Sequence, residues 1–146
     1  ADDFVGVQTY TRERYGAEGN LGPQEGVEQT QMGYEFWPQA TGATLRRAYE
    51  VAGIPMMVTE NGIGTDDDGR RLAYYQSALQ SVATCLQDGL DVRGYFAWSA
   101  FDNFEWMLGY RPTFGLIAVD RRTQQRTIKP SARWLSKVVQ TNRLEQ

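Results

Sequence analysis

Short apolar runs and apolar stripes with helical spacing alternate along the chain and predict three strand-then-helix units. The first strand is expected over residues 4–10, whose sequence FVGVQTY is apolar and β-branched. Residues 16–33 are rich in Gly and Gln and lack apolar periodicity, which predicts a long loop that is functional or mobile. A helix then starts at Trp37 and stops at Gly53. Its predicted buried stripe consists of Trp37, Ala40, Thr44, Ala48 and Val51.

The second unit begins with a strand over residues 55–59 (PMMVT). Its proline occupies the first strand position, where a residue without a backbone N–H is tolerated. The loop over residues 60–69 carries three glycines and the aspartates 66–68. These aspartates precede a helix N-terminus, where they favour the helix dipole. Gly89 ends that helix. Its predicted buried stripe consists of Leu72, Tyr75, Leu79, Val82 and Leu86.

The third strand is expected over residues 92–99 (VRGYFAWS). This segment is almost continuously apolar, as in a strand buried on both faces of a parallel sheet. A loop rich in aromatic residues follows over residues 101–110. The rest of the chain predicts a hairpin over 114–119 and 123–128, a last helix over 130–139 and a frayed tail over 141–146.

Repeated βα units imply parallel strands joined by right-handed crossovers, so the sequence predicts an α/β fold. Two architectures of this class stay open at this point, a doubly wound sheet and a (β/α)8 barrel. Both place their functional sites at the carboxyl end of the strands. No glycine-rich phosphate-binding motif follows the first strand, which weakens the nucleotide-binding alternative. The conspicuous polar or aromatic groups that come just after strands are Tyr10, Glu60, Trp98 and Glu105.

Composition narrows the class of protein. The 146 residues fit one domain, and 15 basic against 18 acidic residues give a net charge of −3. This slightly negative net charge does not indicate the basic surface with which proteins bind nucleic acid or an anionic membrane. No apolar run approaches the roughly 20 residues that a membrane-spanning helix needs. The chain has no histidine, so any catalysis rests on carboxylates, Tyr, Lys or backbone groups. The single cysteine, Cys85, fits a reducing, cytoplasmic compartment.

Two segments carry candidate chemistry. Glu60 follows an apolar strand in the sequence VTENG, which aims its carboxylate at the carboxyl edge of the sheet. A plain turn explains this motif equally well, because Asn-Gly favours turns. The second segment, WSAFDNFEW at 98–106, combines the flat apolar faces, carboxylates and indole N–H groups that sugar recognition needs. Phe101 and Phe104 are expected in the core, whereas the expected binding residues of this segment are Trp98, Glu105 and Trp106.

At these residues the sequence resembles a known family. The strings VTENG at 58–62, GYFAWSAFDNFEW at 94–106 and GYRPTFGL at 109–116 resemble β-glucosidases of glycoside hydrolase family 1. DFVGVQTYT at 3–11 is similar to the family's sixth barrel strand, and KPSARW at 129–134 to its final helix. The resemblance implies that residues 1–146 are the C-terminal portion of a single (β/α)8 barrel domain, with strands six to eight. Consistent with such a piece, the chain begins at Ala1 with neither an initiator Met nor a signal peptide.

The resemblance also implies roles for individual residues. Glu60 matches the nucleophile that forms a covalent glycosyl-enzyme intermediate in a retaining hydrolase. Tyr10 matches a tyrosine whose hydroxyl holds that nucleophile ionised and oriented. The positions that match substrate-binding residues of the family are Trp98, Glu105, Trp106, Phe114 and Tyr34.

The chain departs from the family pattern in several places. Gln8 stands where Asn is usual, Thr9 where Tyr is usual, and Tyr34 where many members have Trp. The acid/base glutamate, which the family carries in a Thr-x-Asn-Glu-Pro motif, has no counterpart. No metal or organic cofactor is implied.

Two functions of different class follow. The first is a retaining β-glucosidase that acts on a β-glucoside or cello-oligosaccharide and pairs with the missing N-terminal part or with itself. The alternative is a non-catalytic carbohydrate-binding or interaction module derived from a half barrel. A nucleotide-binding domain is a distant third.

Overall fold

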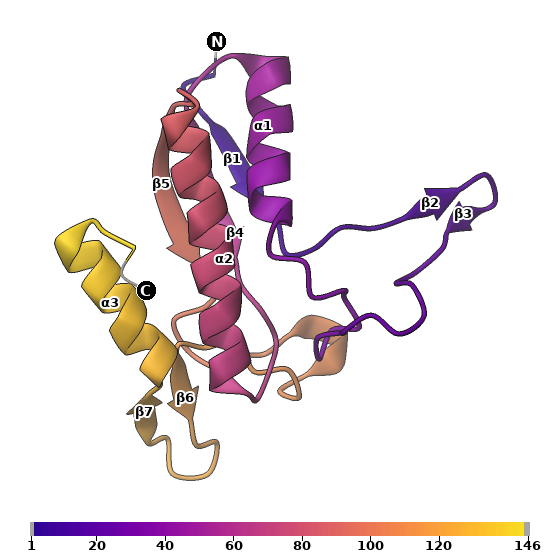
Figure 1. Ribbon diagram of the computed structural model, residues 1–146. Helices are drawn as coiled ribbons and strands as arrows, with labels where there is room; N and C mark the ends of the chain where they lie inside the picture. Colours follow the sequence, from indigo (N-terminus) through magenta and orange to yellow (C-terminus); the bar gives the residue numbers. More distant parts are fainter. Residues whose placement is uncertain (1, 145–146) are drawn as a thin grey trace.

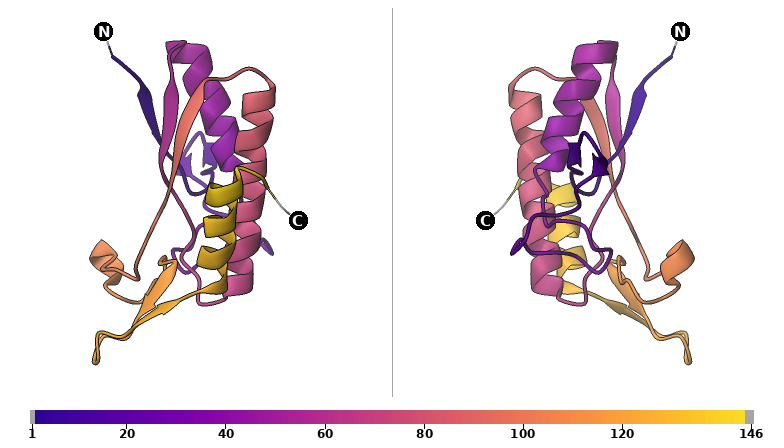
Figure 2. Two further views of the ribbon diagram at one scale, coloured as in Figure 1. Left: turned by 90° about the vertical axis from the view of Figure 1, so that its left-hand side faces the viewer. Right: turned by 90° about the vertical axis from the view of Figure 1, so that its right-hand side faces the viewer.

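The computed structural model of the protein describes residues 2–144. Its centre is a parallel sheet with the strand order β1-β4-β5, and the helices α1 and α2 cover one face of this sheet (Figures 1 and 2). The alternation of strands and helices is as predicted, although the first and third strands are shorter. The bounds are β1 (Val5–Gln8), α1 (Ala40–Ala52), β4 (Met56–Asn61), α2 (Asp68–Gln87) and β5 (Val92–Ala97).

Smaller elements surround the carboxyl end of the sheet. The hairpin β2–β3 lies in an arm that projects from the body (Figure 1) and occupies part of the stretch predicted as a plain loop. The predicted second hairpin, β6–β7, is present and leads into α3, which packs beside α2. Residues 145–146 of the predicted frayed tail lie outside the described residues. The bounds are β2 (Tyr15–Gly16), β3 (Gly19–Asn20), η1 (Trp106–Leu108), β6 (Ile117–Val119), β7 (Arg126–Ile128) and α3 (Pro130–Thr141).

The predicted helix boundaries have clear local causes. Gly53 adopts the left-handed conformation (φ 63°) at the end of α1, and its N–H donates to the carbonyl oxygen of Tyr49. The side chain of Asp67 caps α2 by accepting hydrogen bonds from the backbone N–H groups of Gly69 (2.8 Å) and Arg70 (3.2 Å). Asp68 occupies the first turn of α2. The acidic run therefore starts this helix, as expected.

The hydrophobic core lies between the sheet and the two helices that cover it. Val7, Met56 and Val58 point from the strands toward Leu45 of α1 and Val82 of α2. The opposite face of the sheet is open within the described residues, and Phe96 of β5 is 58 % exposed there. The prediction that the third strand is buried on both faces is therefore wrong for this chain, because helices cover only one face.

Several predicted burial positions are also wrong. Val51 and Leu86 are exposed because each lies on the side of its helix that faces away from the core, whereas Cys85, the neighbour of Leu86, is fully buried. Phe101 and Phe104 are exposed as well, and thus are not core residues. The buried face of α2 consists of Arg71, Tyr74, Tyr75, Ala78, Leu79, Val82 and Cys85.

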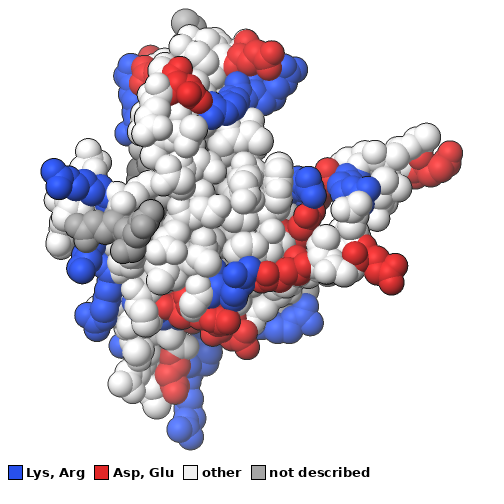
Figure 3. Space-filling model, in the orientation of Figure 1, with Lys and Arg blue, Asp and Glu red and all other residues white. Residues whose placement is uncertain are grey.

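Charged side chains of both signs are interspersed around the rim of the face seen in Figure 3, and no large area of one sign covers it. Between residues 2 and 144, no helix combines the length and the apolar character needed to cross a membrane.

Candidate active site

The orientation of Glu60 depends on an irregularity in the sheet. Met56 and Val58 point into the core, so strict alternation along β4 would send Glu60 there as well. In the pairing with β5, however, Val58 faces Tyr95 whereas Asn61 faces Ala97, so β4 contains an extra residue at this point. Asn61 is consequently buried, and Glu60 turns away from the core.

Asn61 ties the carboxyl ends of all three strands together. Its Nδ2 donates to the carbonyl oxygen of Thr9 (2.7 Å) and to the hydroxyl of Tyr74 (3.0 Å), and its Oδ1 accepts from the hydroxyl of Tyr95 (2.6 Å). The hydroxyl of Tyr74 in turn donates to the carbonyl oxygen of Tyr10 (2.7 Å). The sequence predicts only a turn at Asn61 and does not predict this role, although a side-chain amide at the end of an apolar strand is a signal for it.

Two side chains from the end of β1 hold the Glu60 carboxylate. The hydroxyl of Tyr10 donates to Oε2 (2.7 Å), and Nε2 of Gln8 donates to Oε1 (3.2 Å). Burial raises the pKa of Tyr10 above its ordinary value, and the hydrogen bond and negative charge of Glu60 raise it further. Tyr10 therefore stays protonated and acts as a donor to the carboxylate.

A second wall comes from the segment that follows β5. Nε1 of Trp98 donates to Oε1 of Glu105 (3.0 Å), which joins an indole and a buried carboxylate. The backbone N–H of Trp98 donates to the carbonyl oxygen of Asn61 (2.7 Å), and its carbonyl oxygen accepts from the hydroxyl of Tyr75 (3.1 Å). These bonds fix Trp98 beside the end of β4.

A single cleft collects every residue that the sequence analysis assigned to the site. The ring of Phe114 is buried and meets Tyr10 edge to face, with 6.0 Å between ring centroids. Trp106 is 83 % exposed at the rim. The cleft has a volume of about 280 Å³ and adds one lining residue that the sequence did not suggest, Met32. The complete lining is Tyr10, Met32, Tyr34, Glu60, Trp98, Glu105, Trp106 and Phe114.

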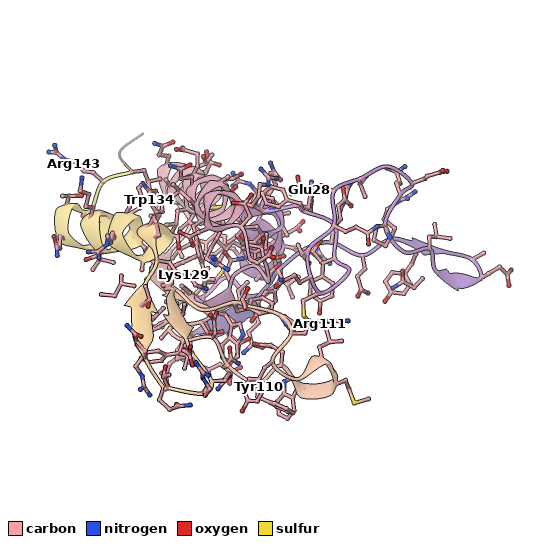
Figure 4. The ribbon with its side chains drawn as sticks, turned by 90° about the horizontal axis from the view of Figure 1, so that it is seen from below. Glu28, Tyr110, Arg111, Lys129, Trp134 and Arg143 are labelled. Carbon is pink, nitrogen blue, oxygen red and sulfur yellow. The ribbon has the colours of Figure 1, made fainter. Side chains whose placement is uncertain are left out.

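A partly buried ion pair and a buried arginine support the loops that carry this lining. Lys129, between β7 and α3 (Figure 4), pairs with Asp102 at 3.0 Å. Burial lowers the pKa of Lys129, while the hydrogen bond to Asp102 opposes that shift. The same Asp102 carboxylate accepts from the backbone N–H of Gly115 (2.8 Å), next to Phe114. The buried guanidinium of Arg71 donates to the carbonyl oxygens of Thr65 and Thr113.

The chemistry of the cleft suits a polyhydroxylated ligand. Glu60 and Glu105 supply acceptors, the exposed indole of Trp106 supplies a donor, and the rings of Trp98 and Phe114 offer apolar faces. Within the described residues, no group of three or more His, Cys, Asp or Glu side chains is arranged to hold a metal ion.

Comparison with known proteins identifies the family. The family model described as glycosyl hydrolase family 1 matches residues 3–144, nearly the whole chain. The chain belongs to this family. It is 38 % identical to the β-glucosidase of an Agrobacterium species over a match that covers 92 % of this chain and 33 % of the relative. A similar match, 38 % identical, covers 82 % of this chain and 29 % of β-glucosidase A from Thermotoga maritima.

Solved structures of family 1 enzymes have the same fold over this region. The crystal structure of β-glycosidase BGL167 is 59 % identical, with a TM-score of 0.93 over 99 % of this chain and 35 % of that one. The Thermotoga maritima β-glucosidase in complex with glucoimidazole is 33 % identical, with a TM-score of 0.90. The prediction of a partial (β/α)8 barrel is thereby confirmed, and the chain spans about a third of the length of these relatives.

Proposed function

We propose that this chain is the C-terminal part of a single barrel domain in a retaining β-glucosidase. The hydrogen-bonded pair of Tyr10 and Glu60, inside the cleft with Trp98 and Glu105, is the observation that carries the proposal. A carboxylate that is held by a phenol and points into an aromatic-lined cleft suits a nucleophile. The relatives that are named β-glucosidases support the substrate class, a β-glucoside or cello-oligosaccharide.

The proposed reaction has two steps, with Glu60 as the nucleophile. In the first, a Glu60 oxygen attacks the anomeric carbon and the bond from that carbon to the aglycone oxygen breaks. A second carboxyl group, which a segment outside this chain would supply, protonates the departing oxygen. In retaining enzymes this group lies about 5–5.5 Å from the carboxyl group of the nucleophile. In the second step the second carboxyl group takes a proton from a water molecule, whose oxygen bonds to the anomeric carbon while the bond from that carbon to the Glu60 oxygen breaks, so the sugar leaves and the Glu60 carboxylate is restored. Tyr10 keeps the carboxylate aimed during both steps.

The remaining cleft residues would bind the sugar at the nonreducing end. The Glu105 carboxylate would accept hydrogen bonds from sugar hydroxyls, and Trp106 would donate from its indole N–H. Trp98 would stack against the apolar face of the ring, with Phe114 beside it. Tyr34, farther along the cleft, would contact the aglycone.

The proposal is tested on the complete enzyme, meaning this chain joined to the N-terminal two thirds of the barrel, its own or that of the 59 %-identical β-glycosidase. The enzyme is incubated with 2,4-dinitrophenyl 2-deoxy-2-fluoro-β-D-glucoside, digested and analysed by mass spectrometry. We expect the fluoroglucosyl adduct on the peptide with Glu60 and none in Glu60→Gln. Sugar binding without an adduct would instead favour the carbohydrate-binding module.

The open edges of the sheet belong to the same proposal. β1 and β5 are the edge strands, and the uncovered face exposes Phe96. Such edges favour pairing with another chain, so we infer that this chain pairs with the N-terminal part of the barrel or with itself. Analytical ultracentrifugation of the chain alone is expected to give self-association, and a stable monomer that hydrolyses cellobiose would contradict this proposal.

A cytoplasmic location is also proposed, supported by the buried free thiol of Cys85.

A further inference from the structure

An ion pair outside the cleft connects its two sides. Arg12 comes shortly after Tyr10, and Glu35 directly follows Tyr34. Nε and Nη2 of Arg12 donate to the two carboxylate oxygens of Glu35, both at 2.9 Å. The Glu35 side chain is only 11 % exposed, against 39 % for Arg12. Paired, planar contacts of this kind fix direction as well as distance.

Two further contacts restrict the pair. The hydroxyl of Thr11 donates to the backbone carbonyl oxygen of Glu35 (2.7 Å), so the backbone is tied as well as the side chain. The guanidinium carbon of Arg12 lies 4.6 Å from the centre of the Trp37 ring, just before α1. Arg12 is thus held between a carboxylate and an aromatic face.

Tyr34 occupies a junction next to this pair. It lines the proposed sugar cleft and also a second hollow of about 170 Å³, whose wall includes Arg12 and Glu35. Met32 is shared by the two in the same way. The cleft and the hollow therefore adjoin at Tyr34 and Met32, so an aglycone that extends from one toward the other comes beside Tyr34.

We propose that Arg12 and Glu35 are positioning residues that set the place of Tyr34 and thereby the preference of the enzyme for sugar aglycones. The inference rests on the proposed function. Tyr10 has independent ties to Tyr74, Glu60 and Phe114, so the pair acts on the aglycone side and not on the nucleophile. The hydrogen bonds from Arg12 also hold the pKa of Glu35 below its ordinary value, against the effect of burial, so the pair stays charged near neutral pH.

The test compares two substrates of the complete enzyme. Cellobiose carries a sugar aglycone, whereas β-D-glucosyl fluoride has a leaving group too small to reach Tyr34. For Arg12→Gln we expect kcat/KM for cellobiose to fall about tenfold and that for glucosyl fluoride to stay within about twofold. Arg12→Lys should recover only part of the loss, because an ammonium group cannot make the paired contact. The matched control is Arg47→Gln, which removes an exposed Arg47–Glu50 pair on α1 and should alter neither substrate.

A double-mutant cycle separates positioning from a general structural role. In a Tyr34→Ala background, Arg12→Gln should change cellobiose hydrolysis less than about twofold, because its effect acts through Tyr34. An equal loss in both backgrounds, or an equal loss with both substrates, would overturn the inference while leaving the proposed function intact. A parent enzyme that hydrolyses neither substrate would refute the proposed function, and the inference with it.

Discussion

The phenol of Tyr10 donates a 2.7 Å hydrogen bond to Oε2 of Glu60, although 50 positions separate the two residues in the chain. Strand β1 brings the donor and strand β4 brings the acceptor, and the parallel pairing of the strands places their carboxyl ends side by side. The geometry of the proposed nucleophile is thus a product of sheet formation.

Removing this hydroxyl tests its contribution to turnover. Tyr10→Phe keeps the ring that meets Phe114 but deletes the donor to the Glu60 carboxylate. A hydrogen bond to a charged group is worth about 1.5–3 kcal/mol, so we expect kcat/KM for an aryl β-glucoside to fall about 10- to 100-fold. Tyr15→Phe is the matched control, since Tyr15 makes a similar bond to Glu13 on the projecting hairpin. Equal activities of both variants would show that the Tyr10 bond is dispensable.

Glu105 is expected to matter for both binding and turnover. Glu105→Ala removes the acceptor of the Trp98 indole and leaves that partly buried N–H without its partner. Contacts to sugar hydroxyls tighten in the transition state, so kcat/KM for glucosides should drop at least about tenfold, with KM rising and kcat falling. Steady-state kinetics measure both, and Glu50→Ala on the exposed side of α1 serves as control. Unchanged kinetics in a folded Glu105→Ala enzyme would remove Glu105 from the sugar site.

Position 62 requires glycine because the backbone at Trp98 lies so close to it that no side chain fits between them. A Cβ on Gly62 would lie 1.9 Å from the carbonyl oxygen of Trp98, which is a backbone atom and cannot move away alone. We expect Gly62→Ala to destabilise the enzyme by about 3 kcal/mol and to lower activity by displacing Trp98. Thermal unfolding measures the loss. Gly94→Ala is the control, because its Cβ would meet Met57 at an ordinary 3.6 Å. Similar melting temperatures for the two variants would contradict this account.

Stability should decline in alkaline solution because of buried tyrosines. Burial raises the pKa of Tyr74, Tyr75 and Tyr95 above the ordinary value. Their contribution is therefore complete below about pH 10, where an unfolded tyrosine titrates, and is lost as pH rises further, by up to about 1.4 kcal/mol per pH unit for each group. Urea unfolding between pH 8 and 11 measures the decline. Tyr95→Phe should start less stable, since it loses the bond to Asn61, but should show a shallower decline. A free energy of unfolding that stays constant up to pH 11 would contradict the prediction.

The sequence by itself determined the order of the elements and most of the cleft residues, of which Tyr34 and Phe114 came from the family resemblance and Met32 was not predicted. Apolar runs placed the strands, the spacing of apolar residues placed α1 and α2, and Gly53 and Asp67 set helix ends through local backbone geometry and capping. Because parallel strands end at one edge, residues that follow different strands were expected to meet, and Tyr10, Glu60 and Trp98 do line one cleft. These inferences need only the local sequence and the general rule that the strands of a parallel sheet end at the same edge.

The tertiary structure alone decided which way the decisive side chains point. Strict alternation in β4 would bury Glu60, and the extra residue of β4 relative to both β1 and β5 turns it toward Tyr10 and buries Asn61 instead. The close approach of Trp98 to Gly62, and the exposure of Phe96, likewise depend on which segments pack together. Such features arise from the pairing of residues far apart in the chain, and no local pattern of polar and apolar positions encodes them.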